Sequence, residues 1–155
     1  RPKVADYPFT TLEPHLGVVK SPDDEFRTLV MADIPGLIEG AHQGAGLGIR
    51  FLRHVERCRG LVHLVDLSDA SPIAERVATI RAEIEAYSAD LGARPWLLVG
   101  TKLDAVAETE LPGIRAELAA IAAAGAVPWI MVSAVSGREL KPLLRAMFEL
   151  AGVAT

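Results

Sequence analysis

The sequence predicts an α/β fold in which a mostly parallel β-sheet is flanked by helices. Short apolar segments alternate along the chain with segments of helical periodicity, which is the pattern of strands connected through covering helices. Three of the apolar segments lack polar alternation, as expected for strands that are buried on both faces. With 155 residues, half of them hydrophobic, the chain has enough apolar material for the core of one domain.

Five segments have the composition of strands. Residues 15–19 and 26–33 are separated by the turn-rich sequence KSPDDE, which predicts an antiparallel hairpin. The other three are nearly continuous apolar runs at residues 61–67, 95–100 and 127–134. We therefore expect a hairpin followed by three strands of a parallel sheet.

Apolar residues recur at intervals of three and four in the stretches between these strands. They predict one helix over residues 73–91, a second around residues 114–121 and a third over residues 140–150. Pro142 requires the third helix to begin only a few residues earlier, because proline is tolerated in a first turn but not in a helix interior.

Composition excludes several classes of protein. The net charge of −4 argues against nucleic-acid binding through bulk charge. No apolar run approaches the roughly 20 residues that span a bilayer and no secretory signal opens the chain, so a cytoplasmic protein without membrane contact is expected. The single cysteine, Cys58, is expected to pack in the core. The chain begins with Arg1 and not with methionine, so further residues are expected upstream.

Four polar clusters follow predicted strands or lie in neighbouring loops, where ligands bind in open α/β sheets. Singly, each is explained as well by a helix cap or a turn. Their order along the chain is more informative: a threonine, then DxxG, then [NT]KxD, then SA. This is the order found in guanine-nucleotide-binding domains. The clusters are Tyr7 to Thr11, Asp33 to Gly36, Thr101 to Asp104 and Ser133 to Val135.

The first two clusters fit the phosphate side of such a site. Asp33 at a strand end can hold Mg²⁺, usually through water, because the ion prefers hard oxygen ligands. Gly36 lets a backbone N–H approach a γ-phosphate, and Thr11 supplies a hydroxyl that enters the Mg²⁺ shell only with the third phosphate. Glycines at positions 36, 40, 44, 46 and 48 give this segment the freedom that an order–disorder switch needs.

The last two clusters fit the base side. The carboxylate of Asp104 matches the paired N–H donors on the guanine edge, the stem of Lys102 can lie along the base, and the N–H of Ala134 can meet O6. Adenine presents the opposite polarity and would leave the carboxylate unpaired, so discrimination should be steep.

The blocks KVADYPFTTLEPHLGVV, DIPGLIEGAHQGAGLGIRFLRH and SAVSG resemble the G domain of the Obg (CgtA) family of GTPases over nearly the whole chain. The resemblance implies that residues 1–155 are part of a P-loop NTPase G domain that lacks its first strand, phosphate loop and first helix. It further implies binding of GTP and Mg²⁺, slow hydrolysis to GDP and phosphate, and association with RNA and protein of the large ribosomal subunit during assembly. The intact protein is expected to be monomeric.

Through the shared motifs, the resemblance implies which residues of this chain form the site, although it assigns no catalytic residue. Nucleotide-binding positions are Phe9, Thr10, Thr11, Leu12 and Glu13 in switch I, Asp33, Ile34, Pro35 and Gly36 beside the phosphates, and Thr101, Lys102, Leu103, Asp104, Ser133, Ala134 and Val135 around the base. The expected metal ligands are Thr11 and Asp33, the latter through water.

Three departures from the family pattern bear on activity. Thr101 replaces the usual asparagine but retains a hydroxyl for hydrogen bonding, and Leu37 stands where Ras-like enzymes have the glutamine that positions water, so turnover should be slow. The motif GxxxxGK[ST] is absent from the chain, so this fragment alone is expected to be inactive. An alternative is an interaction module of the same fold without catalysis. An unrelated flavodoxin-like domain would leave the four clusters unexplained.

Overall fold

The computed structural model describes residues 16–34 and 57–152. The chain divides into two compact units, with boundaries after Cys58, Ala78 and Arg94. Residues 59–78 and 95–155 form the sheet unit, and residues 1–58 and 79–94 form the hairpin unit.

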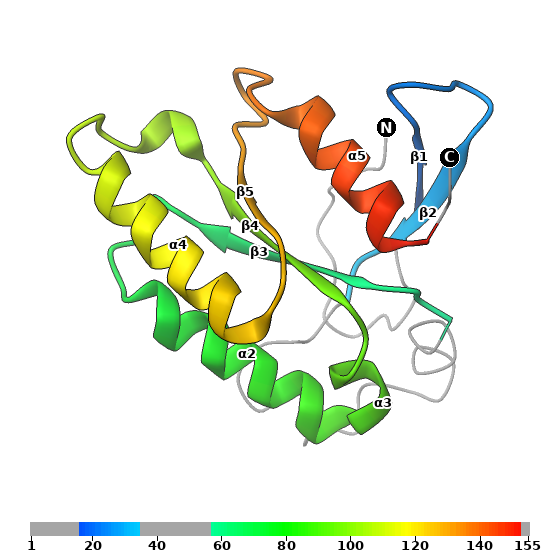
Figure 1. The fold of residues 1–155 in the computed structure, drawn as a ribbon, viewed down its shortest axis with the longest axis horizontal. Coiled ribbons are helices and arrows are strands. Elements are labelled where there is room, and N and C mark those ends of the chain that lie inside the picture. The colour runs from blue at the N-terminus through cyan, green and yellow to red at the C-terminus, as the bar shows by residue number, and fades with distance from the viewer. Residues whose placement is uncertain (1–15, 35–56, 153–155) are drawn as a thin grey trace, which may run out of the picture. The chain divides into compact units, whose positions relative to one another are not determined.

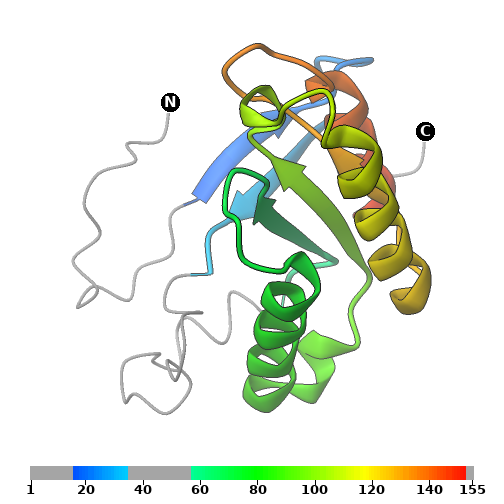
Figure 2. The ribbon, with the colours of Figure 1, turned by 90° about the vertical axis from the view of Figure 1, so that its left-hand side faces the viewer.

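The sheet unit contains three parallel strands, as the sequence predicts. They are β3 (Leu61–Asp66), β4 (Trp96–Thr101) and β5 (Trp129–Met131), hydrogen-bonded in the order β3-β4-β5. The arrowheads of β3 and β4 point to the same edge of the sheet in Figure 2. The segments that follow the strands therefore begin along one edge, and the register places Asp66 opposite Thr101.

Two helices of this unit lie on opposite sides of the sheet (Figure 1). Helix α4 (Leu111–Gly125) contacts β4 and β5, and its Leu118 and Ala122 join a core cluster with Leu98 of β4. Helix α5 (Leu140–Leu150) contacts β4. Both prolines of these helices stand in a first turn, as predicted for Pro142.

Strand β4 is the most buried strand in the described part of the chain. Leu97, Leu98 and Val99 are at most 1% exposed, because the strand has neighbours at both edges and helices on both sides. This double burial accounts for an apolar run without polar alternation. Strand β5 ends at Met131, three residues before the end of the predicted apolar segment.

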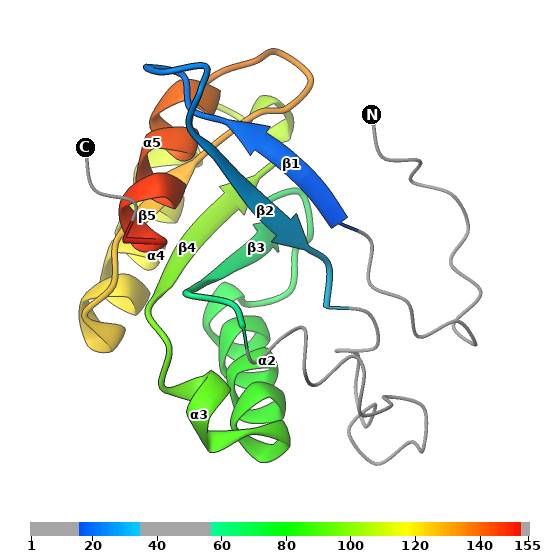
Figure 3. The same ribbon diagram turned by 90° about the vertical axis from the view of Figure 1, so that its right-hand side faces the viewer.

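In the hairpin unit, β1 (Leu16–Lys20) and β2 (Thr28–Ala32) pair antiparallel, which confirms the predicted hairpin (Figure 3). The turn is held by side chains close in sequence: the Asp24 carboxylate accepts a hydrogen bond from the Phe26 N–H at 3.0 Å. Val18 and Val30 stand opposite each other in the register, and both are well exposed.

The prediction of one continuous helix over residues 73–91 is wrong. The structure has α2 (Ile73–Tyr87) and a short α3 (Ala89–Gly92). Ser88 separates them in an extended conformation, and its hydroxyl accepts a hydrogen bond from the Leu91 N–H at 3.1 Å. A serine that caps a new helix competes with continuation of the old one, although the apolar periodicity runs through it.

Cys58 is half-buried, whereas the sequence analysis expects it to pack in the core, so the core encloses it only in part. Burial raises the pKa of its thiol, an effect that the nearby Arg94 partly opposes. The guanidinium of Arg94 also donates to the Cys58 carbonyl. Within residues 16–34 and 57–152, no helix has the length and apolar character needed to cross a membrane.

Candidate functional site

The site residues predicted for the base lie in two loops that follow β4 and β5. The first loop passes from Thr101 at the end of β4 into a 3₁₀ turn, η2 (Leu103–Ala105). The second begins at Ser133, two residues after β5. A backbone hydrogen bond of 3.0 Å from the Leu103 N–H to the Val132 carbonyl joins the two. The side chain of Leu103 is only 3% exposed and anchors the first loop in the core.

Ser133 holds the Asp104 carboxylate in place. Its side chain is fully buried, and its hydroxyl donates to Asp104 Oδ1 at 2.7 Å. The same hydroxyl oxygen accepts the Ser136 N–H at 3.1 Å, which leaves its proton for the carboxylate. Asp104 itself is exposed, so one of its oxygens is fixed by the protein while the residue faces solvent.

Thr101 and Lys102 connect the first loop to β3. The Thr101 hydroxyl donates to the Val65 carbonyl at 3.3 Å, so threonine in place of asparagine ties β4 to its neighbour. Lys102 has φ 61° and ψ 39°, the left-handed conformation that few non-glycine residues adopt. Its ammonium Nζ lies 2.9 Å from Asp66 Oδ2.

Asp66, the partner of Lys102, is not among the site residues that the sequence motifs predict. Both the hydroxyl and the backbone N–H of Ser68 donate to its Oδ1, at 2.6 and 2.8 Å. The Ser68 hydroxyl, followed by Lys102 and the Ser68 N–H, lowers the pKa of Asp66 to about 2. The signal was available, because an acid that directly follows an apolar strand sequence is the feature that marks Asp33.

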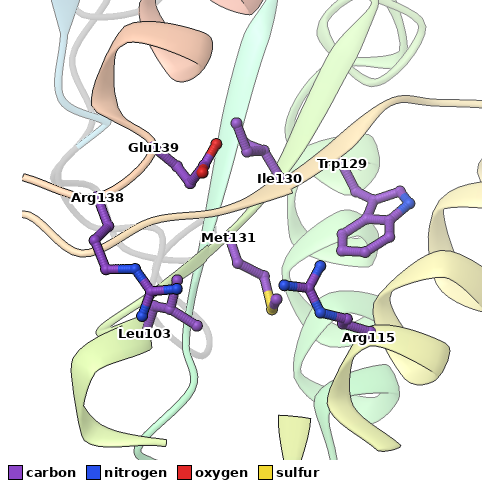
Figure 4. A pocket seen from close by; sticks show the side chains of 7 residues that line it. All are labelled: Leu103, Arg115, Trp129, Ile130, Met131, Arg138 and Glu139. Carbon is purple, nitrogen blue, oxygen red and sulfur yellow. The ribbon is translucent and has the colours of Figure 1, made fainter. Parts of the chain in front are cut away.

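An open pocket of about 230 Å³ lies beside β5. Figure 4 shows Arg115 and Arg138 on either side of Met131. The pocket is lined by Leu103, Arg115, Trp129, Ile130, Met131, Arg138 and Glu139. Leu103 is its one residue from the predicted base loops, so Asp104 and Ser133 do not line this pocket.

Of the remaining predicted site residues, some lie in described segments and others lie outside them. Ala134 and Val135 follow Ser133 in an exposed turn, with Val135 88% exposed. Asp33 and Ile34 directly follow β2. The positions outside the described residues are Phe9, Thr10, Thr11, Leu12, Glu13, Pro35 and Gly36. In the described segments no group of three or more His, Cys, Asp or Glu residues could hold a metal ion, so the magnesium ligands stay a prediction.

Parallel strands that end in a TKxD loop, hydrogen-bonded to a following SA loop, are the arrangement that the motif order predicts for a guanine-nucleotide-binding α/β domain. The comparison with protein families agrees: the model described as "50S ribosome-binding GTPase" matches residues 1–102. The chain belongs to this family. Asp104 and Ser133 lie beyond the residues that the family model matches.

Three curated relatives, all named GTPase Obg, confirm the resemblance to the Obg family. The protein of Acidobacterium capsulatum is 52% identical over 96% of this chain and 43% of its own length. That of Synechococcus elongatus is 50% identical over 96% of this chain and 42% of its length. That of Desulforudis audaxviator is 51% identical over 97% of this chain and 34% of its own length. The chain thus spans less than half the length of each of these relatives.

Proposed function

We propose that this chain is the base-reading and switch portion of a GTPase that binds GTP and Mg²⁺ and slowly hydrolyses GTP to GDP and phosphate. The observation that carries the proposal is the 2.7 Å hydrogen bond between Ser133 and Asp104. It joins two motifs that are 29 residues apart in sequence and fixes the carboxylate beside an exposed loop.

Guanine recognition follows from the chemistry of this carboxylate. Guanine presents two N–H donors on one edge, and a carboxylate offers two acceptor oxygens to match them. Ser133 restrains Asp104 before the base arrives, so less conformational freedom is lost on binding. The stem of Lys102 supplies an apolar surface for one face of the base, and the Ala134 N–H donates to O6.

The phosphate side of the proposal rests on the sequence motifs. Thr11 and Asp33 would hold Mg²⁺, with Asp33 acting through water, and the ion would neutralise charge on the phosphate oxygens. The Gly36 N–H would donate to the γ-phosphate. Thr11 and Gly36 would release their loops after hydrolysis, which gives the protein two states.

The cellular role follows from the family. A family described as 50S ribosome-binding GTPases supports the large ribosomal subunit as partner, and we propose a role in its assembly, in the cytoplasm, by a monomeric intact protein. Measuring GTP hydrolysis by the full-length protein separates this proposal from the alternative of an interaction module without catalysis, which predicts no hydrolysis.

The base assignment is tested by Asp104→Asn in the full-length protein. The amide presents an N–H donor where xanthine carries a carbonyl, so preference should move from GTP to xanthosine triphosphate. A hydrogen bond to a charged group contributes about 1.5–3 kcal/mol, so GTP affinity should fall about 10- to 100-fold. Competition titration with both nucleotides measures the change.

Asp69→Asn is the matched control. Asp69 is also an exposed aspartate that accepts from a serine hydroxyl, at 2.7 Å, but it lies outside the TKxD loop. Its substitution should leave both affinities unchanged. Unaltered GTP affinity in Asp104→Asn would remove Asp104 from the base site.

A further inference from the structure

Lys102 combines a strained backbone with a long, flexible side chain. Its left-handed φ of 61° is held by neighbouring backbone bonds, including the Ala105 N–H to the Lys102 carbonyl at 2.9 Å. The side chain is 60% exposed. Fixing an exposed lysine in one rotamer costs up to about 2 kcal/mol of conformational entropy, so a lysine that must lie along a base benefits from a partner that holds it beforehand.

Asp66 is placed to be that partner. The β3–β4 register sets it opposite Thr101, one residue before Lys102, and its Oδ2 meets the lysine Nζ at 2.9 Å. Both Ser68 donors bind the other oxygen, Oδ1. The carboxylate is therefore oriented by its own loop and offers Oδ2 to Lys102. Arg76 fixes the backbone of the same residue by donating to the Asp66 carbonyl at 2.8 Å.

The next turn of the same loop repeats this local chemistry without the lysine. Asp69 Oδ1 accepts from the Ser71 N–H at 2.8 Å and from the Ser71 hydroxyl at 2.7 Å, as Asp66 does from Ser68. The charged neighbour of Asp69 is Arg76, at 4.0 Å, on helix α2. The two aspartates share their turn geometry, so contact with the base loop is what distinguishes Asp66.

We propose that Asp66 is a positioning residue for guanine-nucleotide binding, which holds the Lys102 side chain where its stem can lie along the base. This inference rests on the proposed function. Asp66 acts through Lys102 and makes no contact with nucleotide in the proposal. Because the base is common to GDP and GTP, the effect should be equal for both nucleotides and independent of Mg²⁺.

The test is Asp66→Asn in the full-length protein, measured by equilibrium titration with fluorescent GDP and a non-hydrolysable GTP analogue. Asparagine retains the Oδ1 acceptor for Ser68 and removes the charge. Exposed ion pairs contribute about 0.2–1 kcal/mol, so both affinities should fall by up to about fivefold. The loss should shrink at high salt, which screens exposed pairs. Asp69→Asn is the matched control and should bind as the wild type does.

A double-mutant cycle separates positioning from general stability. In a Lys102→Met background, Asp66→Asn should cause no further loss, because the residue through which it acts has lost its charge. Asp66→Glu should restore part of the affinity, and the thermal midpoint of nucleotide-free Asp66→Asn should match that of Asp69→Asn.

Three outcomes would overturn the inference: equal effects of Asp66→Asn and Asp69→Asn, tighter binding by Asp66→Asn, or an undiminished loss in the Lys102→Met background. Wild-type protein that binds no guanine nucleotide would instead refute the proposed function.

Discussion

The sheet unit and the hairpin unit use similar apolar residues and bury them very differently. Val99 in β4 is 0% exposed, whereas Val18 in β1 is 69% exposed and Val30 in β2 is 64% exposed. The strands are alike in composition, so the difference lies in what covers them within the described residues. An apolar strand sequence therefore indicates the capacity for burial, and neighbouring strands and helices decide whether burial occurs.

The two units also treat their polar side chains differently. In the sheet unit, Ser133 is fully buried and uses its hydroxyl as both donor and acceptor. In the hairpin turn, Ser21 accepts the Asp23 N–H at 3.1 Å in an exposed position. The buried hydroxyl orients a carboxylate that water could not hold in the same way, whereas the exposed hydroxyl accepts a backbone N–H that water could also satisfy.

The largest effect expected from this comparison is on stability. Leu98→Ala should lower the free energy of unfolding by about 2–5 kcal/mol, because it opens a cavity in the core cluster. Val30→Ala should change it by no more than about 0.5 kcal/mol, as for other exposed positions. Denaturant unfolding of the full-length protein, followed by the fluorescence of Trp96 in β4 and Trp129 in β5, measures the effect of Leu98→Ala. Hydrogen exchange of the backbone amides in β1 and β2 measures the effect of Val30→Ala.

A Val30→Ala cost as large as that of Leu98→Ala would break the comparison. It would mean that a part of the protein outside the described residues covers this face of the hairpin, so that both units are core in the whole molecule.

A smaller effect is expected on binding. Ser133→Ala removes the donor to Asp104 and leaves the Ser136 N–H without its acceptor, so GDP affinity should fall about tenfold. Ser21→Ala, in the hairpin turn, should leave GDP affinity unchanged. Calorimetric titration of both variants sharpens the distinction between site and turn serines. A similar loss in the two would show that the effect is general destabilisation.

The smallest effect concerns how Asp66 is held within the sheet unit. Its folded-state pKa of about 2 lies below the ordinary 3.8, so the ionised form stabilises the fold above about pH 4 and that contribution is lost as the pH falls towards 2. Ser68→Ala and Lys102→Met should each raise the Asp66 pKa, because the Ser68 hydroxyl is the largest single cause of the lowered value and Lys102 contributes both a hydrogen bond and its charge. Carboxyl carbon-13 NMR measures the Asp66 pKa in both variants, and an unchanged value in either one would show that the residue replaced does not hold Asp66 in its ionised form.

Much of this architecture was predictable because strands buried on both faces have an unmistakable apolar pattern. The meeting of Asp104 and Ser133 was also predictable in outline, since both follow parallel strands. The break at Ser88 was not, because a local cap overrode a periodicity that continues through it. The role proposed for Asp66 was not predictable either, because it depends on the β3–β4 register, which places Asp66 beside Lys102 and which no short motif contains.

The left-handed backbone of Lys102 restricts what can replace it. Glycine would relax the backbone, and asparagine or aspartate would tolerate it, but none of them carries a long aliphatic stem. Arginine and methionine carry such a stem and would keep the strain. The replacements that relieve the strain therefore lack the surface proposed for the base, and those that keep the surface keep the strain that lysine already bears, so tolerated substitutions at position 102 should be few even though its side chain is largely exposed.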